Sequence, residues 1–261
     1  MPRMSNQLQI QHVRHVLVRL EETIIFALIE RAQFLRNLPV YETGRFGRSL
    51  EGRSLCDFML YECECSHAKV RRYTSPDEHP FFNNLPAPIL PPIGYSENPL
   101  VPNQININAR IRTIYETTIL DRITQNGDDE QYGSTAVCDV TCLQALSKRI
   151  HYGKFVAESK CRKPSPILQQ AMQKESRNEI LDGITDAKVE REVLERVLHK
   201  ARTYTNELRQ AHMHHALEPE IIRDIYQDII IPLNKEVQVE YILHRSQHTA
   251  ESQANNQQVI L

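Results

Sequence analysis

The sequence predicts an all-α protein: a single-domain bundle of long helices that spans residues 1–245. Several long segments carry apolar residues at helical spacing, and no alternating strand pattern of useful length occurs. The chain has only 8 glycines in 261 residues, whereas strands joined by tight turns consume glycine. With 41% apolar and 25% charged residues, the composition is that of a globular protein with a sizeable core.

Helical periodicity marks the elements in order. The first helix is expected at about 11–36, where one apolar stripe ends before Pro39. Further helices are expected at about 54–73, 107–123, 134–161, 186–215 and 232–245. Lys163-Pro164 stops the helix at 134–161. Pro232 is expected in the first turn of the last helix, where its missing N–H is not needed.

Two segments break this pattern. Residues 74–103 contain eight of the 14 prolines, so this linker cannot be helical and is expected to lie extended across the surface of the bundle. Residues 246–261 are polar and aperiodic, which predicts a disordered C-terminal tail.

Charge and hydropathy exclude several classes of partner. With 31 Lys and Arg against 33 Asp and Glu, the chain lacks the basic surplus that nucleic-acid binding needs. No apolar run approaches the roughly 18 residues that indicate a membrane span, and the first residues have no apolar core of the signal-peptide type. We therefore expect a cytoplasmic protein that binds neither nucleic acid nor membrane.

Metal and cofactor chemistry are not expected either. The six cysteines lack the paired spacing of a zinc site and are interpreted as reduced thiols. His212, His214 and His215 are clustered without a carboxylate partner, and Asp128-Asp129-Glu130 is expected in a solvated turn. The motifs of nucleophile elbows, phosphate-binding loops and zinc-binding helices are missing.

The helix at 134–161 carries the most specific pattern. Arg149 and Lys160 are eleven residues apart, close to three helical turns, so both point the same way, with Gly153 between them. Two cations that flank a gap in one helix face could bind an anion. The alternative is that both cations reach solvent and Gly153 serves close helix packing. Glu190, and the pair Asn234 and Gln238 at four-residue spacing, are weaker candidates that singly are typical of surface residues.

Four long blocks give these residues a context. The segments 18–34, 71–82, 146–161 and 230–243, in this order, resemble the all-helical chorismate mutases of fungi and plants, and the match runs from about Val13 to Arg245. The resemblance implies an intertwined homodimer that converts chorismate to prephenate without a cofactor. It also implies feedback inhibition by tyrosine and activation by tryptophan.

The resemblance implies roles for the candidate residues. Arg14 and Arg149 would bind the two carboxylates of chorismate, Lys160 would donate to its ether oxygen and a carboxylate, and Glu190 would accept from its hydroxyl. Gln238 replaces a glutamate of the yeast-type enzymes that must be protonated. Because an amide donates at every pH, Gln238 predicts a flat activity profile on the basic side.

Two substrate-binding positions and the effector site also depart from the family pattern. Asn234 replaces a threonine, and Asp186 replaces an asparagine, either weakening the binding of a dianion or capping its helix and pointing away. The effector residues that the resemblance implies are Arg71, Arg72, Gly133 and Ser134. Glu218 replaces a threonine that is tied to the switch between states in the yeast-type enzyme. The alternatives to a regulated mutase are a catalytically lapsed relative that acts as a partner or regulatory subunit, and a generic helical scaffold.

Overall fold

The computed structural model describes residues 10–93, 98–210 and 217–258, and within these residues the chain forms helices and no strand. The predicted all-α class is confirmed. The long helices are α1 (Ile10–Arg31), α2 (Leu55–Lys69), α5 (Tyr132–His151), α6 (Gly153–Arg162), α9 (Ala187–Gln210) and α11 (Ile231–Gln258). The short helices are α3 (Asn108–Ile114), α4 (Leu120–Ile123), α7 (Pro166–Gln173), α8 (Arg177–Ile184) and α10 (Pro219–Ile225). Two π-helical turns and three 3₁₀ turns complete the set: η4 (Tyr115–Ile119), η5 (Tyr226–Ile230), η1 (Leu38–Tyr41), η2 (Arg48–Leu50) and η3 (Arg72–Thr74).

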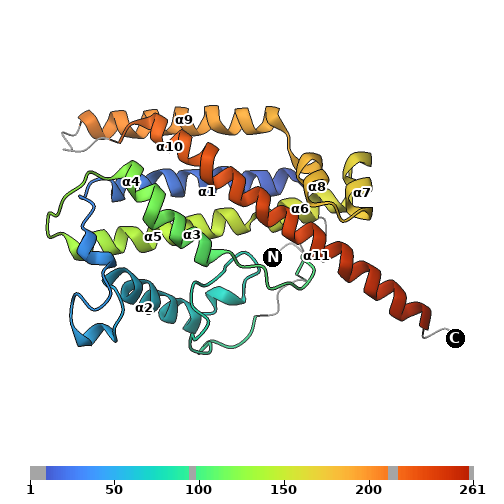
Figure 1. Ribbon diagram of the computed structural model, residues 1–261, viewed down its shortest axis with the longest axis horizontal. Helices are drawn as coiled ribbons and strands as arrows, with labels where there is room; N and C mark the ends of the chain where they lie inside the picture. Colours follow the sequence, from blue (N-terminus) through green and yellow to red (C-terminus); the bar gives the residue numbers. More distant parts are fainter. Residues whose placement is uncertain (1–9, 94–97, 211–216, 259–261) are drawn as a thin grey trace.

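The helices form an elongated bundle (Figure 1). Helix α1 packs on α5 and α9, helix α2 packs on α5, and α11 crosses the bundle and packs on α6 and α8. One apolar cluster lies among α1, α2, α5 and α10, and a second lies among α6, α7, α8 and α11. The short helices α7 and α8 close one end of the bundle. They are absent from the sequence prediction, although Ser165 and Ser176 cap their first turns.

The helix expected at 134–161 is divided at Tyr152 into α5 and α6. Packing against α11 explains the break. The Asn234 side chain donates from Nδ2 to the carbonyl oxygens of Arg149 and Ile150, at 3.2 and 3.0 Å. A side chain of a neighbouring helix thus donates to carbonyl groups in the last turn of α5, where helical hydrogen bonds end. Sequence periodicity does not reveal such a contact.

The last helix begins earlier and ends later than the sequence predicts. Helix α10, the π-helical turn η5 and α11 follow one another without a gap from Pro219 to Gln258. Pro232 therefore lies inside a helical run and not in its first turn; the wider π-helical turn directly before it leaves room for the proline ring. Residues 246–258 continue α11 beyond the end at about 245 that the periodicity predicts.

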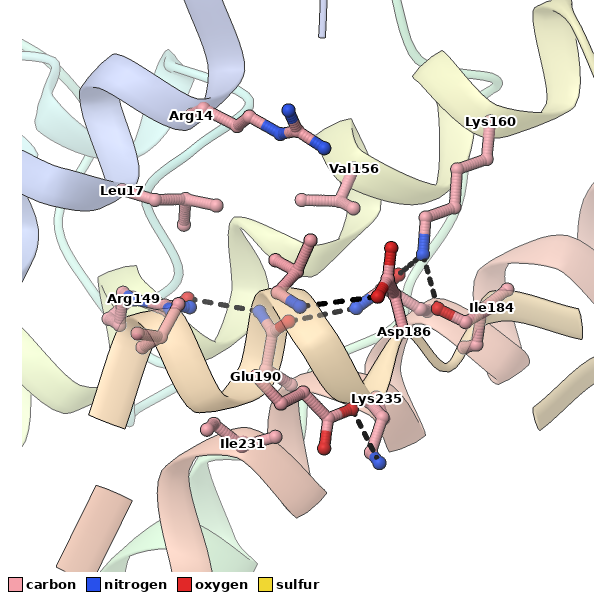
Figure 2. Close-up of a pocket in the computed structure, with 14 residues that line it drawn as sticks. Arg14, Leu17, Arg149, Val156, Lys160, Ile184, Asp186, Glu190, Ile231 and Lys235 are labelled. Carbon is pink, nitrogen blue, oxygen red and sulfur yellow. Dashed lines mark hydrogen bonds and ion pairs between the residues drawn. The ribbon is translucent and has the colours of Figure 1, made fainter. Parts of the chain in front are cut away.

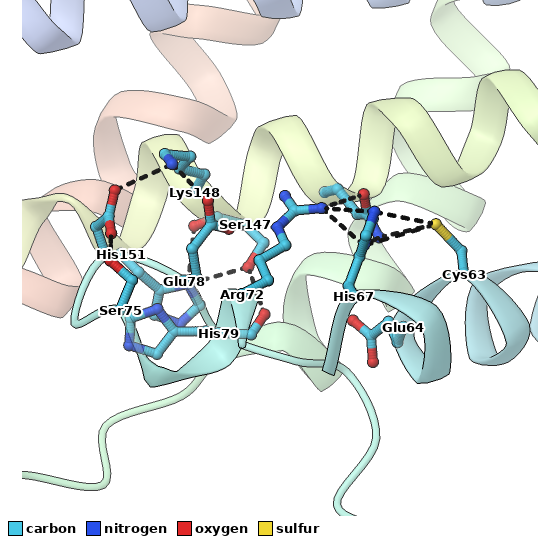
Figure 3. Close-up of polar contacts among 12 residues, drawn as sticks. Cys63, Glu64, His67, Arg72, Ser75, Glu78, His79, Ser147, Lys148 and His151 are labelled. Carbon is cyan, nitrogen blue, oxygen red and sulfur yellow. Dashed lines mark hydrogen bonds and ion pairs between the residues drawn. The ribbon is translucent and has the colours of Figure 1, made fainter. Parts of the chain in front are cut away.

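The described part of the proline-rich linker runs without helix over the bundle once η3 has ended. Two kinds of contact hold it. The Glu64 carboxylate accepts from the backbone N–H groups of Phe81 and Phe82, and the His79 ring stacks on His151 of α5 at a centroid distance of 4.2 Å (Figure 3). Leu100 is buried in the second apolar cluster, so the linker also contributes to the core.

Candidate active site

A cavity of about 180 Å³ lies between α1, α5, α6, α9 and the first turns of α11 (Figure 2). We call it the active-site cavity. All seven residues that the sequence analysis assigns to catalysis and substrate binding line it: Arg14, Arg149, Lys160, Asp186, Glu190, Asn234 and Gln238. These residues come from segments that are far apart in the sequence, so the fold brings together what the resemblance implies to act together.

Arg149 lines this cavity from the last turn of α5. Its side chain is only 5% exposed, and among the described residues no acceptor lies within hydrogen-bond distance of its Nε or Nη1. Burial lowers the pKa of Arg149, although Tyr226 and Glu21 oppose this shift. A buried guanidinium with unsatisfied donors is costly to the fold. The unsatisfied donors of Arg149 are suited to bind an anion in the cavity. The alternative that Arg149 reaches solvent is wrong, because its side chain is buried.

Lys160 approaches the cavity from α6. Its Nζ donates to the Ile184 carbonyl oxygen at 2.6 Å and to Gln238 Oε1 at 3.4 Å. Since an ammonium group has three donors, one N–H is left for a ligand. Burial lowers the pKa of Lys160 to about 8, even though Asp186 and Glu190 raise it. The cation is thus partly desolvated, which strengthens its attraction for a negative charge in the cavity.

Gly153 serves helix packing and does not leave a gap for an anion. A Cβ atom at this position would lie 2.7 Å from the Asn234 carbonyl oxygen and 2.9 Å from its Nδ2. The hypothesis of an anion-binding gap above Gly153 is therefore wrong. Asn234 fills that space, and its Oδ1 accepts from Gln238 Nε2 at 2.9 Å. Because a primary amide has two N–H donors, this hydrogen bond leaves the second N–H of Gln238 available to a ligand.

Glu190 and Arg14 lie nearer the rim. The Glu190 carboxylate accepts from Lys235 Nζ at 2.9 Å, and Arg14 is exposed on the first turns of α1. Sequence reasoning did not find Lys235; its position directly after Asn234 on the same helix was the available signal. It also missed the apolar walls of the cavity, which are Leu17, Val156, Ile184, Val189, Val193 and Ile231.

Asp186 caps helix α9. Its Oδ1 accepts from the backbone N–H groups of Lys188 and Val189, at 3.0 and 3.2 Å, the geometry of an N-cap. The carboxylate still lines the cavity and raises the pKa of Lys160. Asp186 is thus a capping residue that does not point away from the cavity; that it weakens the binding of a dianion stays a prediction.

The four implied effector residues do not meet within this chain. Arg72 donates to Glu78 Oε2 at 3.0 Å and to Gln144 Oε1 at 2.9 Å (Figure 3). Arg71, in a left-handed backbone conformation, donates to the Pro91 carbonyl oxygen. Gly133 and Ser134 are exposed in the first turn of α5. Ser134 and Gln144 are ten residues apart, about 15 Å along the helix, so the two halves are separated.

The remaining predictions concern residues outside the cavity. Glu218 precedes α10 at its N-cap position, and His212, His214 and His215 lie outside the described residues. Asp129 is not merely solvated, because it accepts from the Leu35 backbone N–H at 2.9 Å and from Asn37 Nδ2 at 2.7 Å. All six cysteines are free thiols. In the described part of the chain no three potential ligands cluster for a metal, and no helix could cross a membrane.

The chemistry of the cavity favours a small dianion. The charged residues that line it are four cations and two carboxylates, which leaves an excess of two positive charges: Arg14, Arg149, Lys160, Lys235, Asp186 and Glu190. The apolar walls suit a carbon skeleton. Donors with unused N–H groups are fixed before any ligand arrives. Such an arrangement can hold a flexible molecule in one conformation and stabilise negative charge that develops on an oxygen.

This chain is similar to chorismate mutases of fungi and plants. The family profile "Chorismate mutase type II" matches residues 131–239. The chorismate mutase of Emericella nidulans is 43% identical over 94% of this chain and 95% of its own length. The corresponding protein of Schizosaccharomyces pombe is 41% identical over 92% of this chain and 98% of its own length. The chloroplastic chorismate mutase 1 of Petunia hybrida is 44% identical over 89% of this chain and 74% of its own length.

Solved structures agree in fold. The Aro7p chorismate mutase of Candida albicans, in complex with L-Trp, superposes with a TM-score of 0.84 at 38% identity, covering 91% of this chain and 92% of its own. AtCM1 with tyrosine bound in its allosteric site superposes with a TM-score of 0.84 at 42% identity, covering 93% of this chain and 98% of its own. From its cavity, its fold and these similarities, the chain belongs to the eukaryotic chorismate mutases, a family of isomerases.

Proposed function

We propose that the active-site cavity binds chorismate as a folded dianion and that five of the residues lining it act as follows. Arg149 and Arg14 bind the two carboxylates, because a guanidinium offers paired donors to a carboxylate. Lys160 donates its remaining N–H to the ether oxygen and an adjacent carboxylate. Gln238 donates to the same ether oxygen, and Glu190, held by Lys235, accepts from the substrate hydroxyl.

The reaction is an intramolecular Claisen rearrangement. The ether C–O bond breaks while a C–C bond forms between the ends of the enolpyruvyl group and the ring, and no proton or electron leaves the molecule. The protein therefore contributes by holding the bent conformer and by stabilising the negative charge that builds on the ether oxygen. Side chains with fixed N–H donors are sufficient for both tasks.

The observation that carries this proposal is the unsatisfied Arg149 guanidinium, which lies buried in a cavity that Lys160 also enters. Loss of chorismate's ultraviolet absorbance on adding the pure protein tests it. The wild type is expected to turn over chorismate, and Arg149→Ala to lose about a hundred- to a thousandfold in kcat/KM.

The matched control is Arg162→Ala. It removes a cation of α6 that pairs with Glu158 outside the cavity, and Glu158 keeps Tyr241 and Arg245 as partners. This control is expected to retain activity. A wild type without turnover would support the alternative of a catalytically lapsed relative, and equal rates in the wild type and Arg149→Ala would remove Arg149 from the site.

We further propose a homodimer in which tyrosine inhibits and tryptophan activates. The separation of Arg71 and Arg72 from Gly133 and Ser134 supports this assembly, since one amino acid could contact both groups only if they came from different protomers. AtCM1 has been solved with tyrosine and with phenylalanine in its allosteric site, and the Candida albicans enzyme with L-Trp.

Two measurements test the assembly and its regulation. Light scattering during gel filtration is expected to give twice the 30.3 kDa mass of the chain. Initial rates are expected to fall with tyrosine and rise with tryptophan, and Arg72→Ala is expected to abolish both responses. A monomer, or rates that neither amino acid changes, would contradict the proposal and indicate that Glu218 accompanies a lapsed effector site.

We also propose a cytoplasmic location. The six free thiols are typical of a reducing compartment. Imaging of the full chain with a fluorescent label fused at its C-terminus tests the location, and accumulation in an organelle would contradict it.

A further inference from the structure

A second cavity, of about 550 Å³, opens beside the active-site cavity. It lies where the end of α6, the start of α7, the end of α8 and the start of α9 come together. Lys160, Ile184 and Asp186 line both cavities, so the two share a wall. Figure 2 shows this shared side, with Lys160 and Asp186 close to Ile184. We call the second cavity the vestibule.

The vestibule carries an excess of positive charge. Lys160, Lys163 and Lys188 line it together with one carboxylate, Asp186. That carboxylate is engaged by two backbone N–H groups at the start of α9. Lys163 and Lys188 are exposed, and neither makes an ion pair with any of the described residues.

These two lysines differ from most cations of the molecule. On the helical hairpin that borders the vestibule, Lys174 pairs with Glu179 at 2.9 Å and Arg177 pairs with Glu240. Lys235, at the rim of the active-site cavity, pairs with Glu190 at 2.9 Å. An exposed cation that is paired contributes little to the field at a distance, whereas unpaired ones add to it. The residues that line the vestibule thus carry more positive than negative charge, which favours an anion there.

From this geometry we propose that Lys163 and Lys188 form a capture site that concentrates the dianionic substrate beside the active-site cavity. The inference rests on the proposed function, because the dianion is taken to be chorismate. Lys160 belongs to both cavities and would pass the anion from one to the other. Lys163 and Lys188 do not line the active-site cavity, so they would raise the rate of productive encounter without contacting the reacting atoms.

The expected effect follows from the charges. Each lysine attracts a dianion with twice the energy of a single charge pair, and in water at roughly 10 Å this is a small but useful term for each cation. Salt screens it, because the Debye length falls from about 30 Å at 0.01 M to about 8 Å at physiological ionic strength. Removal of both lysines is therefore expected to lower kcat/KM about tenfold at low salt and little at high salt.

The test measures kcat and KM for chorismate from about 0.01 M to about 0.3 M ionic strength in the full-length protein. The double variant Lys163→Gln, Lys188→Gln is compared with the wild type and with Lys174→Gln, which removes the same charge from the neighbouring hairpin outside the vestibule. A second double variant, Lys163→Arg with Lys188→Arg, restores the charge. Circular dichroism checks that each variant is folded.

The proposal predicts that the glutamine double variant loses kcat/KM at low salt, keeps its kcat, and shows a shallower salt dependence. The arginine double variant is expected to match the wild type, and Lys174→Gln to stay within about twofold of it. A glutamine double variant that behaves like Lys174→Gln would overturn the capture site, and so would a parallel fall in kcat. Wild-type protein without turnover would instead overturn the proposed function itself.

Discussion

Two arginines of this molecule are buried in different ways. Arg31, at the end of α1, is 0% exposed and pairs with Asp139 at 2.7 Å. Its remaining donors reach Tyr41 and the carbonyl oxygens of Phe34, Leu35 and Arg36. Burial lowers the pKa of Arg31, but Asp139 and the neighbouring tyrosines more than offset this and raise it. Arg149 is buried almost as deeply, yet its Nε and Nη1 have no acceptor among the described residues.

The difference separates structure from function. The fold completes the hydrogen bonds of Arg31 within the chain, so that cation stabilises the junction of α1, α5 and the η1 turn. The fold provides no acceptor for Nε and Nη1 of Arg149 among the described residues, and burial lowers the pKa of Arg149. A buried cation without hydrogen-bond acceptors destabilises the free protein, and it is retained where a ligand supplies the missing acceptors.

The largest effect on stability is expected from Arg31→Met. This change leaves the Asp139 carboxylate buried beside Tyr41 and Tyr115 without its cation, and should lower the free energy of unfolding by about 3–5 kcal/mol. Urea denaturation measures the loss. The double variant Arg31→Met, Asp139→Leu should recover part of it, and a loss under about 1 kcal/mol for the single variant would show that the pair contributes little.

Arg149→Met is expected to lower activity strongly without loss of stability. It removes a desolvated charge whose Nε and Nη1 have no acceptor among the described residues, so the free energy of unfolding should stay the same or rise by about 1 kcal/mol. Activity should fall about a hundred- to a thousandfold in kcat/KM. The same urea titration and the chorismate assay give both numbers. A variant that is strongly destabilised would show that Arg149 is structural, as Arg31 is.

The pH dependence is expected to report Lys160. Its pKa of about 8 in the free protein predicts that kcat/KM falls tenfold per pH unit above about pH 8. A bound dianion favours the charged form, so kcat should remain flat to higher pH. The flat basic limb that Gln238 predicts by itself is thus expected for kcat only.

Stability should also depend on Lys160, because folding lowers its pKa from 10.5 to about 8. The buried charge destabilises the folded protein fully below about pH 8. The free energy of unfolding should therefore rise between pH 8 and pH 10.5, where the folded protein loses this charge before the unfolded chain does.

Gln238→Glu is the matched variant for this profile. A carboxylate beside Lys160 would be ionised at neutral pH and could not donate to the ether oxygen, so activity should fall at pH 7.5 and recover toward acid pH. In the wild type, a steep loss of activity between about pH 5 and 7 would argue against Gln238 as a pH-independent donor.

The smallest effect is expected from Asp186→Asn. Asparagine caps a helix as well as aspartate does, so stability should change by only a few tenths of a kcal/mol. The lost negative charge should raise kcat/KM two- to threefold, and the basic limb should move to lower pH because Asp186 raises the pKa of Lys160. A basic limb that stays in place would show that Asp186 acts as a cap alone.

The sequence predicts the long helices well because their apolar residues repeat at helical spacing, as in α1, α2 and α9. It misses α7 and α8, where only caps such as Ser165 mark helices of two turns. The break at Tyr152 and the place of Pro232 inside a helical run depend on contacts with distant residues, above all on Asn234 against Gly153. No local pattern contains that information.

The site shows the same division. The family resemblance identifies Arg14, Arg149 and Lys160 by position, and the fold brings them to one cavity. The pattern of residues could not show that Arg149 is unsatisfied, or that Lys235 holds Glu190. Satisfaction of a buried group depends on all of its neighbours at once, so it becomes visible only in three dimensions.

Calorimetric titration with a non-reactive bicyclic dicarboxylate that has the bent shape of the folded substrate tests the central claim most directly. Arg149, whose Nε and Nη1 have no acceptor among the described residues, together with Lys160 should bind the dicarboxylate at least about a hundredfold more tightly than its monomethyl ester, and Arg149→Met should remove this preference. Equal affinity of the wild type for the dicarboxylate and the ester would contradict the account.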